Sequence, residues 1–287
     1  MTGDGVDETE TALPDVCVLT HPLGAAGENA TRTLLEILSA VTAVSLITAY
    51  LPEDSEIRAD HEVTEVSEKG AAQSTILLAA VRFLGNQLRM CRALYRRDEE
   101  VVIFFGATAY LIPVLWAKLL GRTVLLEPRG DVPLTLRLGW EQRMPSPVAA
   151  ALAGTVRLIE RLGYRSADGI VTYTPSMATE LGLDRYAETL HTEGARYVDT
   201  ERFSPETAYE KRRRVVGFLG RLDEEKGIRE LAAVARHLPD DVTFRFIGDG
   251  PLREWLETEL AAERKAGQAE VTGWVDHEEV PAELNDL

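Results

Sequence analysis

The sequence predicts an α/β protein made of two successive halves, each built around a parallel sheet. Short apolar runs alternate with amphipathic helical stretches along most of the 287 residues, the pattern of parallel sheets covered by helices on both faces. Residues 204–214 carry a proline and a run of charges, as a linker does, and the alternation then restarts. We therefore expect an N-terminal domain over residues 1–205 and a C-terminal domain over residues 206–287. The second domain is expected to be incomplete, because no strand follows the last helical pattern.

The N-terminal half is expected to contain strands wherever β-branched and aromatic residues cluster between turn residues or charges. These runs are residues 15–20, 43–51, 62–66, 101–106, 123–128 and 168–174. Helices are expected where apolar residues recur every three or four positions. Those stretches are residues 29–40, 71–97, 109–121 and 147–167.

In the C-terminal half the same signals continue. The predicted strands are residues 214–220, 241–248 and 269–275, and the predicted helices are residues 226–238, 250–267 and 280–287. One uncharged stretch, residues 101–117, is shorter than the roughly 20 apolar residues that cross a bilayer. It also contains Gly106 and Pro113. We therefore expect it to form a buried strand, a turn and a packed helix.

The charge balance narrows the function. Asp and Glu number 47 and Lys and Arg 31, which gives a net charge of −16. Nucleic-acid-binding proteins need a basic surface, so that class is not expected. Only five of the basic residues are lysines, and an acidic, lysine-poor surface predicts a halophilic protein. Two cysteines and an N-terminus without an apolar signal core predict a cytoplasmic location. The five histidines lack metal-ligand spacing, so no metal or cofactor is expected.

The strongest chemical signal lies in residues 215–238. A buried strand ends in a tight turn at Gly220, and a helix is expected to begin near Lys226. The start of a helix stabilises anions such as phosphate through free backbone N–H groups and the helix dipole. Arg221 and Lys226 both lie where their charges can reach one diphosphate. The alternative is that they pair on the surface with the nearby acids Asp223, Glu224 and Glu225.

This segment resembles the nucleotide-sugar half of retaining glycosyltransferases with the GT-B fold, the large family-four or glycosyl transferases group 1 type. In that group a Gly-Arg-Leu…Glu-Lys-Gly motif holds the donor diphosphate. This chain has those residues at 220–222 and 225–227. The resemblance therefore implies two Rossmann-like domains, with the donor diphosphate held by Gly220, Arg221 and Lys226.

Other family landmarks follow in the same order. Residues 248–251 match a strand that ends in Gly-x-Gly-Pro, with Gly248 and Gly250 as the glycines. Residues 269–275 match the next strand, where family backbone near Gly273 and Val275 holds the nucleobase. The resemblance is close over roughly residues 150–287 and looser before them.

The N-terminal domain is implied to bind the acceptor. The family often has a glycine pair after its first strand, and here the turn of residues 21–28 contains Gly27 nearest the expected helix. This turn is either a substrate loop or a simple connection. The family also often ends a mid-domain strand in His-Gly, whereas this chain has Arg129 in place of the histidine. Arg129 and Asp131 are candidates to face a ligand from the strand end.

Residues 82–97 contain five arginines and no acid. Arg82, Arg89, Arg92 and Arg96 fall near one face of the predicted helix, and Arg97 follows them. One interpretation is a solvated helix face next to acidic neighbours. The other is a face that docks on anionic lipid or on a phosphorylated lipid acceptor.

We expect a glycosyltransferase that moves a sugar from a nucleoside-diphosphate donor to a lipid, glycan or small-molecule acceptor, with retention. It is expected to act in the cytoplasm, with peripheral contact at the inner face of the membrane through residues 82–97. The alternative is a non-catalytic or fragmentary relative that binds nucleotide. No catalytic residue is identified.

The family's donor-sugar motif, two glutamates separated by seven residues, follows a further strand, which the sequence does not reach before Leu287. Glu270 and Glu278 have this spacing but flank a predicted strand, so we treat the match as coincidence. The chain is therefore expected to bind nucleotide weakly and to transfer sugar poorly.

The net charge of −16 predicts that salt stabilises the fold. Repulsion between acidic side chains destabilises the compact state, and added ions screen this repulsion. We expect the melting temperature to rise from low salt to molar KCl in differential scanning calorimetry. A melting temperature independent of KCl would contradict the halophilic interpretation.

Overall fold

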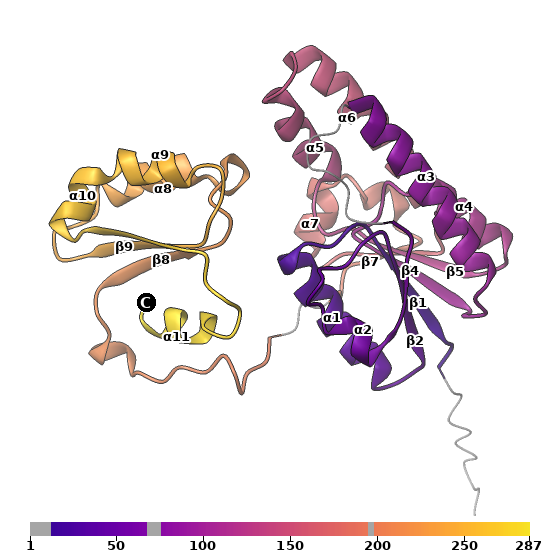
Figure 1. Cartoon of the computed structure of the whole chain (residues 1–287), viewed down its shortest axis with the longest axis horizontal. Coiled ribbons are helices and arrows are strands. Elements are labelled where there is room, and N and C mark those ends of the chain that lie inside the picture. Colours follow the sequence, from indigo (N-terminus) through magenta and orange to yellow (C-terminus); the bar gives the residue numbers. More distant parts are fainter. Residues whose placement is uncertain (1–12, 68–75, 195–197) are drawn as a thin grey trace, which may run out of the picture. The chain divides into compact units, whose positions relative to one another are not determined.

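A fully parallel sheet of seven strands, sheet A, forms the centre of the N-terminal part of the chain (Figure 1). The computed structural model describes residues 13–67, 76–194 and 198–287. The spatial order of sheet A is β3-β2-β1-β4-β5-β6-β7. Its strands are β1 (Val16–Thr20), β2 (Val44–Thr48), β3 (Glu62–Glu65), β4 (Val101–Phe105), β5 (Thr123–Glu127), β6 (Gly169–Val171) and β7 (Leu190–His191).

Helices cover both faces of sheet A because its strands bury alternate residues on opposite sides. Val18 of β1 belongs to a core cluster with Leu35 on one face. The neighbouring Leu19 belongs to the cluster on the other face, with Met90 and Val114. Helices α1 and α2 lie on the first face, and α3, α4 and α6 lie on the second (Figure 1). The helices of this part are α1 (Ala25–Ser39), α2 (Ile57–Asp60), α3 (Ile76–Tyr95), α4 (Leu111–Leu119), α5 (Val132–Glu141), α6 (Ser146–Ser166) and α7 (Pro175–Glu180), with a short 3-10 turn, η1 (Asp184–Tyr186).

The predicted strand–helix alternation is confirmed, with differences at particular elements. Helix α1 begins at Ala25, four positions before the predicted start, because Gly24 is extended and its carbonyl accepts the Glu28 N–H at 2.8 Å. Helix α5 was not predicted. It is marked by Asp131, whose carboxylate accepts the Leu134 N–H at 2.8 Å, and by a proline in its first turn, both ordinary helix-start signals. The first residues of the predicted helix 71–97 lie outside the described residues.

The uncharged residues 101–117 form β4, a turn at Gly106 and most of α4. Phe104 and Val114 are fully buried in the same core cluster. Within residues 13–67, 76–194 and 198–287, no helix is both long enough and apolar enough to cross a bilayer.

A second parallel sheet, sheet B, forms the centre of the C-terminal part, in the order β10-β9-β8. Its strands are β8 (Val215–Leu219), β9 (Thr243–Ile247) and β10 (Ala269–Gly273). Helices α8, α9 and α10 lie on one face and α11 on the other (Figure 1). The helices are α8 (Ile228–Ala235), α9 (Arg253–Glu259), α10 (Ala261–Ala266) and α11 (Val280–Asn285), with 3-10 turns η2 (Tyr209–Lys211) and η3 (Glu224–Lys226). The helix expected over residues 250–267 is thus two helices, which meet at Leu260.

The two faces of sheet B are held differently. Phe244 and Phe246 point from β9 into the apolar core, where their rings stack with centroids 4.4 Å apart. Between them, Arg245 forms ion pairs with Glu283 at 2.8 Å and with Glu270 and Asp286 at 3.4 Å. The face that carries α11 is therefore held partly by charge.

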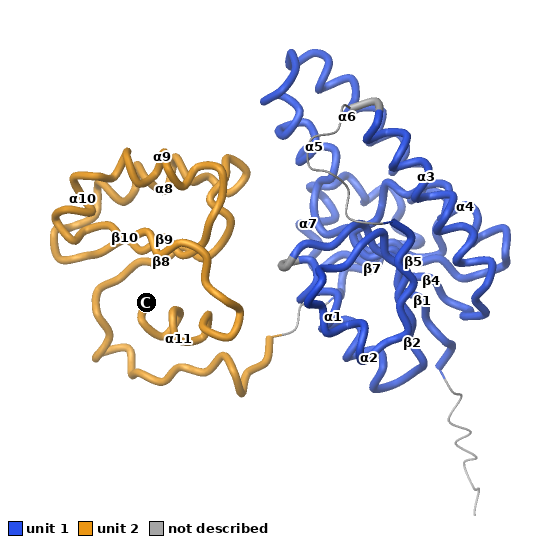
Figure 2. The backbone as a smooth tube through the Cα atoms, viewed as in Figure 1, with its two compact units in different colours: residues 1–196 blue, residues 197–287 orange. Residues whose placement is uncertain are grey.

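The chain divides into two compact units, residues 1–196 and 197–287 (Figure 2). This division precedes the expected boundary at residue 205, and hydrogen bonds explain the difference. Arg202 Nη2 donates to the His277 carbonyl at 2.8 Å. Asn285 Nδ2 donates to the Ser204 carbonyl at 3.1 Å, and its Oδ1 accepts the Glu206 N–H at 2.8 Å. Hydrogen bonds thus hold residues 202–206, which include the start of the predicted linker, to the second unit.

One carboxyl group is buried in the first unit. Glu160 of α6 is 6% exposed, and the Thr108 hydroxyl donates to its Oε1 at 2.5 Å. Burial raises the pKa of Glu160 to about 7, and the nearby Asp131 carboxylate raises it further while the Thr108 hydrogen bond opposes the rise. The carboxyl group of Glu160 therefore titrates around neutral pH, whereas the carboxyl groups of surface glutamates titrate at lower pH.

Glu160→Gln is expected to remove a pH dependence of folding stability. Between pH 4.5 and about 7 the folded chain keeps a proton that the unfolded chain has released, so stability falls as pH rises through this window. Glutamine keeps the acceptor for Thr108 and carries no charge. Above the window we expect the variant to be more stable by on the order of 3 kcal/mol.

The measurement is urea unfolding of the wild type, Glu160→Gln and the control Glu180→Gln across this pH range. Glu180 is exposed on α7, so its variant should follow the wild-type profile. A Glu160→Gln profile with the wild-type slope would contradict the account.

Candidate functional site

The strands of sheet B end in glycines that lie together at its carboxyl edge. Gly220 follows β8, Gly248 follows β9 and Gly273 ends β10. The Gly220 N–H donates to the Ile247 carbonyl at 3.0 Å, and the Gly248 N–H donates to the Gly273 carbonyl at 2.8 Å. Three glycines expected at the nucleotide site are therefore adjacent. Ligands of open α/β sheets bind at this edge.

Two of the glycine positions leave no room for a side chain. A β-carbon on Gly248 would lie 2.0 Å from the Gly220 carbonyl oxygen, and its φ of +137° also favours glycine. A β-carbon on Gly250 would lie 2.5 Å from the Leu222 carbonyl oxygen. The loops after β8 and β9 consequently run in direct contact, and the Leu222 N–H donates to the Asp249 carbonyl at 3.0 Å.

A local hydrogen bond and a glycine turn fix the conformation of the loop over residues 220–227. The Asp223 carboxylate accepts the Lys226 N–H at 3.0 Å and caps η3. Gly227 then turns the chain with a φ of +67°, and α8 begins at Ile228, close to the start predicted at Lys226. The loop therefore leads directly into the positive end of a helix dipole.

Arg221 is engaged with local carboxylates. Its Nη2 lies 3.0 Å from Asp223 Oδ2 and 2.9 Å from Glu225 Oε2, while its side chain is 61% exposed. This is the surface pairing that the sequence left open as the alternative. Lys226 is exposed, and no described carboxylate forms an ion pair with it. Exposed ion pairs typically contribute only about 0–1 kcal/mol, so a phosphate with two negative charges can displace Glu225 from Arg221.

Arg253 is a cation of this edge that the sequence analysis missed. Its guanidinium nitrogens would lie 3.0 and 3.1 Å from a β-carbon on Gly273. It pairs with Asp249 at 3.0 Å and Glu257 at 3.1 Å. The sequence signal that could have identified Arg253 is its position, two residues after the Gly-x-Gly-Pro match. Val275, expected near the nucleobase, is half-buried in the loop that follows β10.

In the first unit, His21 and Arg129 meet at the carboxyl edge of sheet A. A β-carbon on Gly106, which follows β4, would lie 3.4 Å from the Arg129 side chain and 3.5 Å from His21 Cε1. The Arg129 guanidinium lies over the Phe105 ring, 4.5 Å from its centroid. Loss of hydration from the surrounding protein, and then the Arg129 charge, lower the pKa of His21, although the residue keeps contact with solvent. The imidazole is therefore neutral around pH 7.

The other acceptor-side candidates have structural roles. Asp131 caps α5 and pairs with Arg157 at 3.1 Å. Gly27 lies in the first turn of α1, where a β-carbon would be 3.2 Å from the Leu23 side chain. The structure thus joins Arg129 to His21, a residue that the sequence analysis treated only as a scattered histidine. In the described parts of the chain, no three His, Cys, Asp or Glu side chains are grouped closely enough to hold a metal ion.

Known proteins resemble this chain in sequence. A 2-deoxystreptamine glucosyltransferase of Streptomyces kanamyceticus is 31% identical over 147 residues, 46% of this chain and 38% of that protein. A 2-deoxystreptamine N-acetyl-D-glucosaminyltransferase of Niallia circulans is 37% identical over 76 residues, 25% of this chain and 20% of that protein. The matches thus span less than half of these relatives.

Solved structures resemble it in fold. Anabaena HepE in complex with UDP-glucose superposes with a TM-score of 0.65 at 12% identity, covering 96% of this chain and 72% of that structure. The lipopolysaccharide outer core galactosyltransferase WaaB in its apo form gives a TM-score of 0.59 at 13% identity, with 95% and 72% covered. The expected fold class, α/β with the parallel sheets of GT-B glycosyltransferases, is confirmed.

The match to a family model falls on the unit that carries the glycine-lined edge. Residues 199–286 match the family described as "Glycosyl transferases group 1", and the second compact unit spans residues 197–287. The match to the glycosyl transferases group 1 family therefore covers nearly the whole of the second unit.

Proposed function

We propose that this chain is a glycosyltransferase that takes its sugar from a nucleoside diphosphate, held at the carboxyl edge of sheet B. The observation that carries the proposal is the contact between the loops after β8 and β9, which Gly248 and Gly250 permit and which holds the loop of Arg221 and Lys226 at the carboxyl edge of sheet B. Two exposed cations on one loop that leads into a helix start suit a diphosphate.

The two cations have a role in the transfer itself. When the bond from the sugar to the diphosphate breaks, negative charge grows on the departing phosphate. Positive groups already in place stabilise that charge more than they stabilise the intact donor, which accelerates the reaction. Arg221 is held near the loop by Asp223 and Glu225, and Lys226 extends into solvent from η3. Retention of configuration is part of the proposal and is supported by the family resemblance.

A uridine nucleotide is the donor that the comparisons support. Anabaena HepE was solved with UDP and with UDP-glucose. Its fold covers nearly all of this chain, and residues 199–286 match the group 1 family. UDP is therefore the probe of choice for the site.

For the acceptor we propose a small molecule bound at the carboxyl edge of sheet A. The sequence relatives are named for transfer to 2-deoxystreptamine, which favours a small hydroxylated acceptor over a lipid or a glycan. The neutral imidazole of His21 can accept the proton of an acceptor hydroxyl, because desolvation and then the charge of Arg129 lower its pKa. A cytoplasmic location stays a prediction, with which the free, buried Cys17 and Cys91 are compatible.

Removing the two cations is expected to weaken UDP binding. Arg221→Ala and Lys226→Ala should each cost on the order of 1.5–3 kcal/mol, because each removes a charge-assisted contact to phosphate. Glu225→Gln should tighten binding, because it removes one of the carboxylates that compete for Arg221. Calorimetric titration with UDP measures all three effects.

Arg229→Ala is the matched control. Arg229 also lies near the start of α8, but its guanidinium is 4.3 Å from the centroid of the Trp255 ring and pairs with Glu224 at 2.8 Å. This variant should bind UDP like the wild type and keep the wild-type circular dichroism spectrum. Equal UDP affinity in the wild type and the Arg221→Ala/Lys226→Ala double variant would overturn the assignment.

A further inference from the structure

The exposed side of α3 carries a strip of apolar residues. Val81, Leu84, Leu88 and Tyr95 are 60%, 49%, 57% and 69% exposed. Their spacing of three, four and seven positions places them on one side of the helix. Large apolar side chains are common singly on surfaces, but a continuous strip indicates a surface that contacts something else.

A strip of arginines runs beside the apolar strip. Arg82, Arg89, Arg92 and Arg96 follow one another at intervals of seven, three and four positions, so they lie on the adjacent side of the same helix. Arg89, Arg92 and Arg96 are exposed and Arg82 is half-exposed. No ion pair joins these four side chains to a carboxylate of the described residues, so the interpretation as a face paired with acidic neighbours is not supported.

Arg97, at the end of the same segment, differs from these four arginines because it forms ion pairs. Its side chain is only 9% exposed and pairs with Glu62 at 3.3 Å and Glu99 at 3.1 Å. It belongs to the packing of the first unit and not to the exposed strip. The contrast indicates that the four exposed arginines are available to an outside partner.

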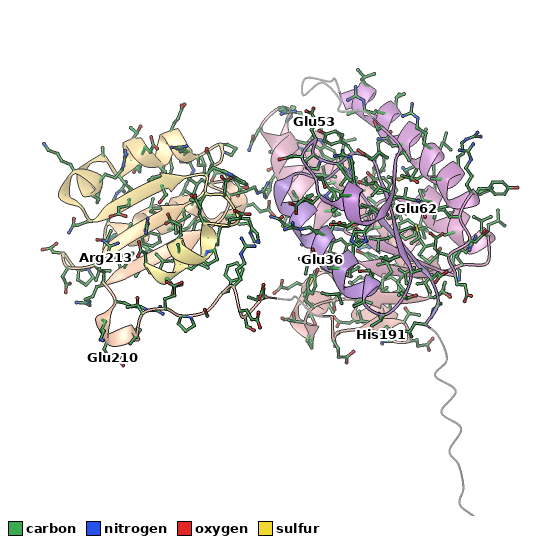
Figure 3. All side chains as sticks on the ribbon, turned by 60° about the horizontal axis from the view of Figure 1, so that its bottom comes forward. Glu36, Glu53, Glu62, His191, Glu210 and Arg213 are labelled. Carbon is green, nitrogen blue, oxygen red and sulfur yellow. The ribbon has the colours of Figure 1, made fainter. Side chains whose placement is uncertain are left out.

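The remaining side of α3 fixes the helix to the protein. Met90, Ala93 and Leu94 are buried in the core cluster beneath sheet A. No acid occurs within α3 itself, and the nearest acids in sequence are Asp98, Glu99 and Glu100, which follow its end. Figure 3 labels Glu36 on α1 and Glu62 on β3, both exposed, and α1 covers the opposite face of the sheet. In a chain with a net charge of −16, the α3 strip is therefore a local basic surface.

We propose that α3 lies flat on a lipid bilayer with anionic headgroups, with its leucines in the interface and its arginines against the phosphates. An apolar strip bordered by basic residues is the arrangement that binds membrane surfaces. No described helix is long and apolar enough to span a bilayer, which agrees with a helix that lies on the surface. The proposal goes beyond the proposed function, because donor binding needs no membrane.

Charge disfavours a second copy of the chain as the occupant of this surface. Two α3 helices docked face to face would bring together eight arginines that form no ion pair with a described carboxylate, and neither copy has an acid between residues 76 and 97. Like charges at short distance repel. A surface of lipid phosphates is complementary to both the sign and the row-like arrangement of the arginines.

Co-sedimentation with vesicles tests the proposal on the full chain. We expect binding to vesicles of equal parts phosphatidylcholine and phosphatidylglycerol, and none to phosphatidylcholine alone. Arg89→Gln/Arg92→Gln should lower the partition coefficient about thirty-fold, from the contribution of each arginine near an anionic surface. Leu84→Gln/Leu88→Gln should lower it about tenfold or more, and added salt should weaken wild-type binding.

The matched control is Arg213→Gln/Lys265→Gln, which changes the net charge equally at exposed positions of the second unit. It should bind vesicles like the wild type, and all variants should keep the wild-type melting temperature and UDP affinity. Equal binding to both vesicle types, or equal loss in the control, would overturn the proposal. A dimer in sedimentation velocity that the α3 substitutions dissociate would overturn it in favour of self-association.

Discussion

The carbonyl oxygen of Gly220 and the α-carbon of Gly248 approach so closely that a β-carbon on Gly248 would lie 2.0 Å from that oxygen. This approach brings the loops after β8 and β9 into contact, and the Leu222–Asp249 backbone hydrogen bond then fixes their register. Because both loops follow parallel strands, they meet at the edge where α/β sheets bind ligands. The positions of Arg221, Lys226 and the start of α8 all depend on this contact.

The ion pairs of Arg221 at this edge are weak enough for a ligand to replace one of the carboxylates. Arg221 has two carboxylate partners, Asp223 and Glu225, and remains 61% exposed. Such pairs hold a side chain in place without much free energy, because water screens both charges. A diphosphate that replaces one carboxylate gains a positioned cation and leaves Glu225 in water. In the first unit, Arg129 acts differently: its charge lies over the Phe105 ring and adds to the desolvation that lowers the pKa of the neighbouring His21.

The sequence predicted the strands and the turn at Gly220 well because both depend on local signals. An apolar run such as β4 or β9 predicts a buried strand whichever strands lie beside it in the sheet. The glycines at 220, 248, 250 and 273 lie at or just after the ends of strands. Long-range contacts were not predictable in the same way. Asn285 forms hydrogen bonds with Ser204 and Glu206, which are 81 and 79 positions away, so composition alone placed the boundary too late. His21 and Arg129 come from strands that are distant in sequence, and only the sheet order brings them together.

Helix α5 was missed for a different reason. Its start carries an aspartate cap and a proline, but Gly139 lies inside it and weakens its helical signal. Glu160 was missed because its sequence neighbours are those of an ordinary amphipathic helix. Its burial depends on how α6 packs against Thr108, a contact between residues 52 positions apart.

The central claim is that a nucleoside diphosphate binds where the strands of sheet B end. Backbone amide chemical shifts of the isotope-labelled chain, followed by NMR during titration with UDP, test it most directly. The account predicts that the largest shift changes fall in residues 220–227, 248–250 and 273–275, with saturation at a single site. Changes confined to other residues, or no changes up to a large excess of UDP, would contradict it.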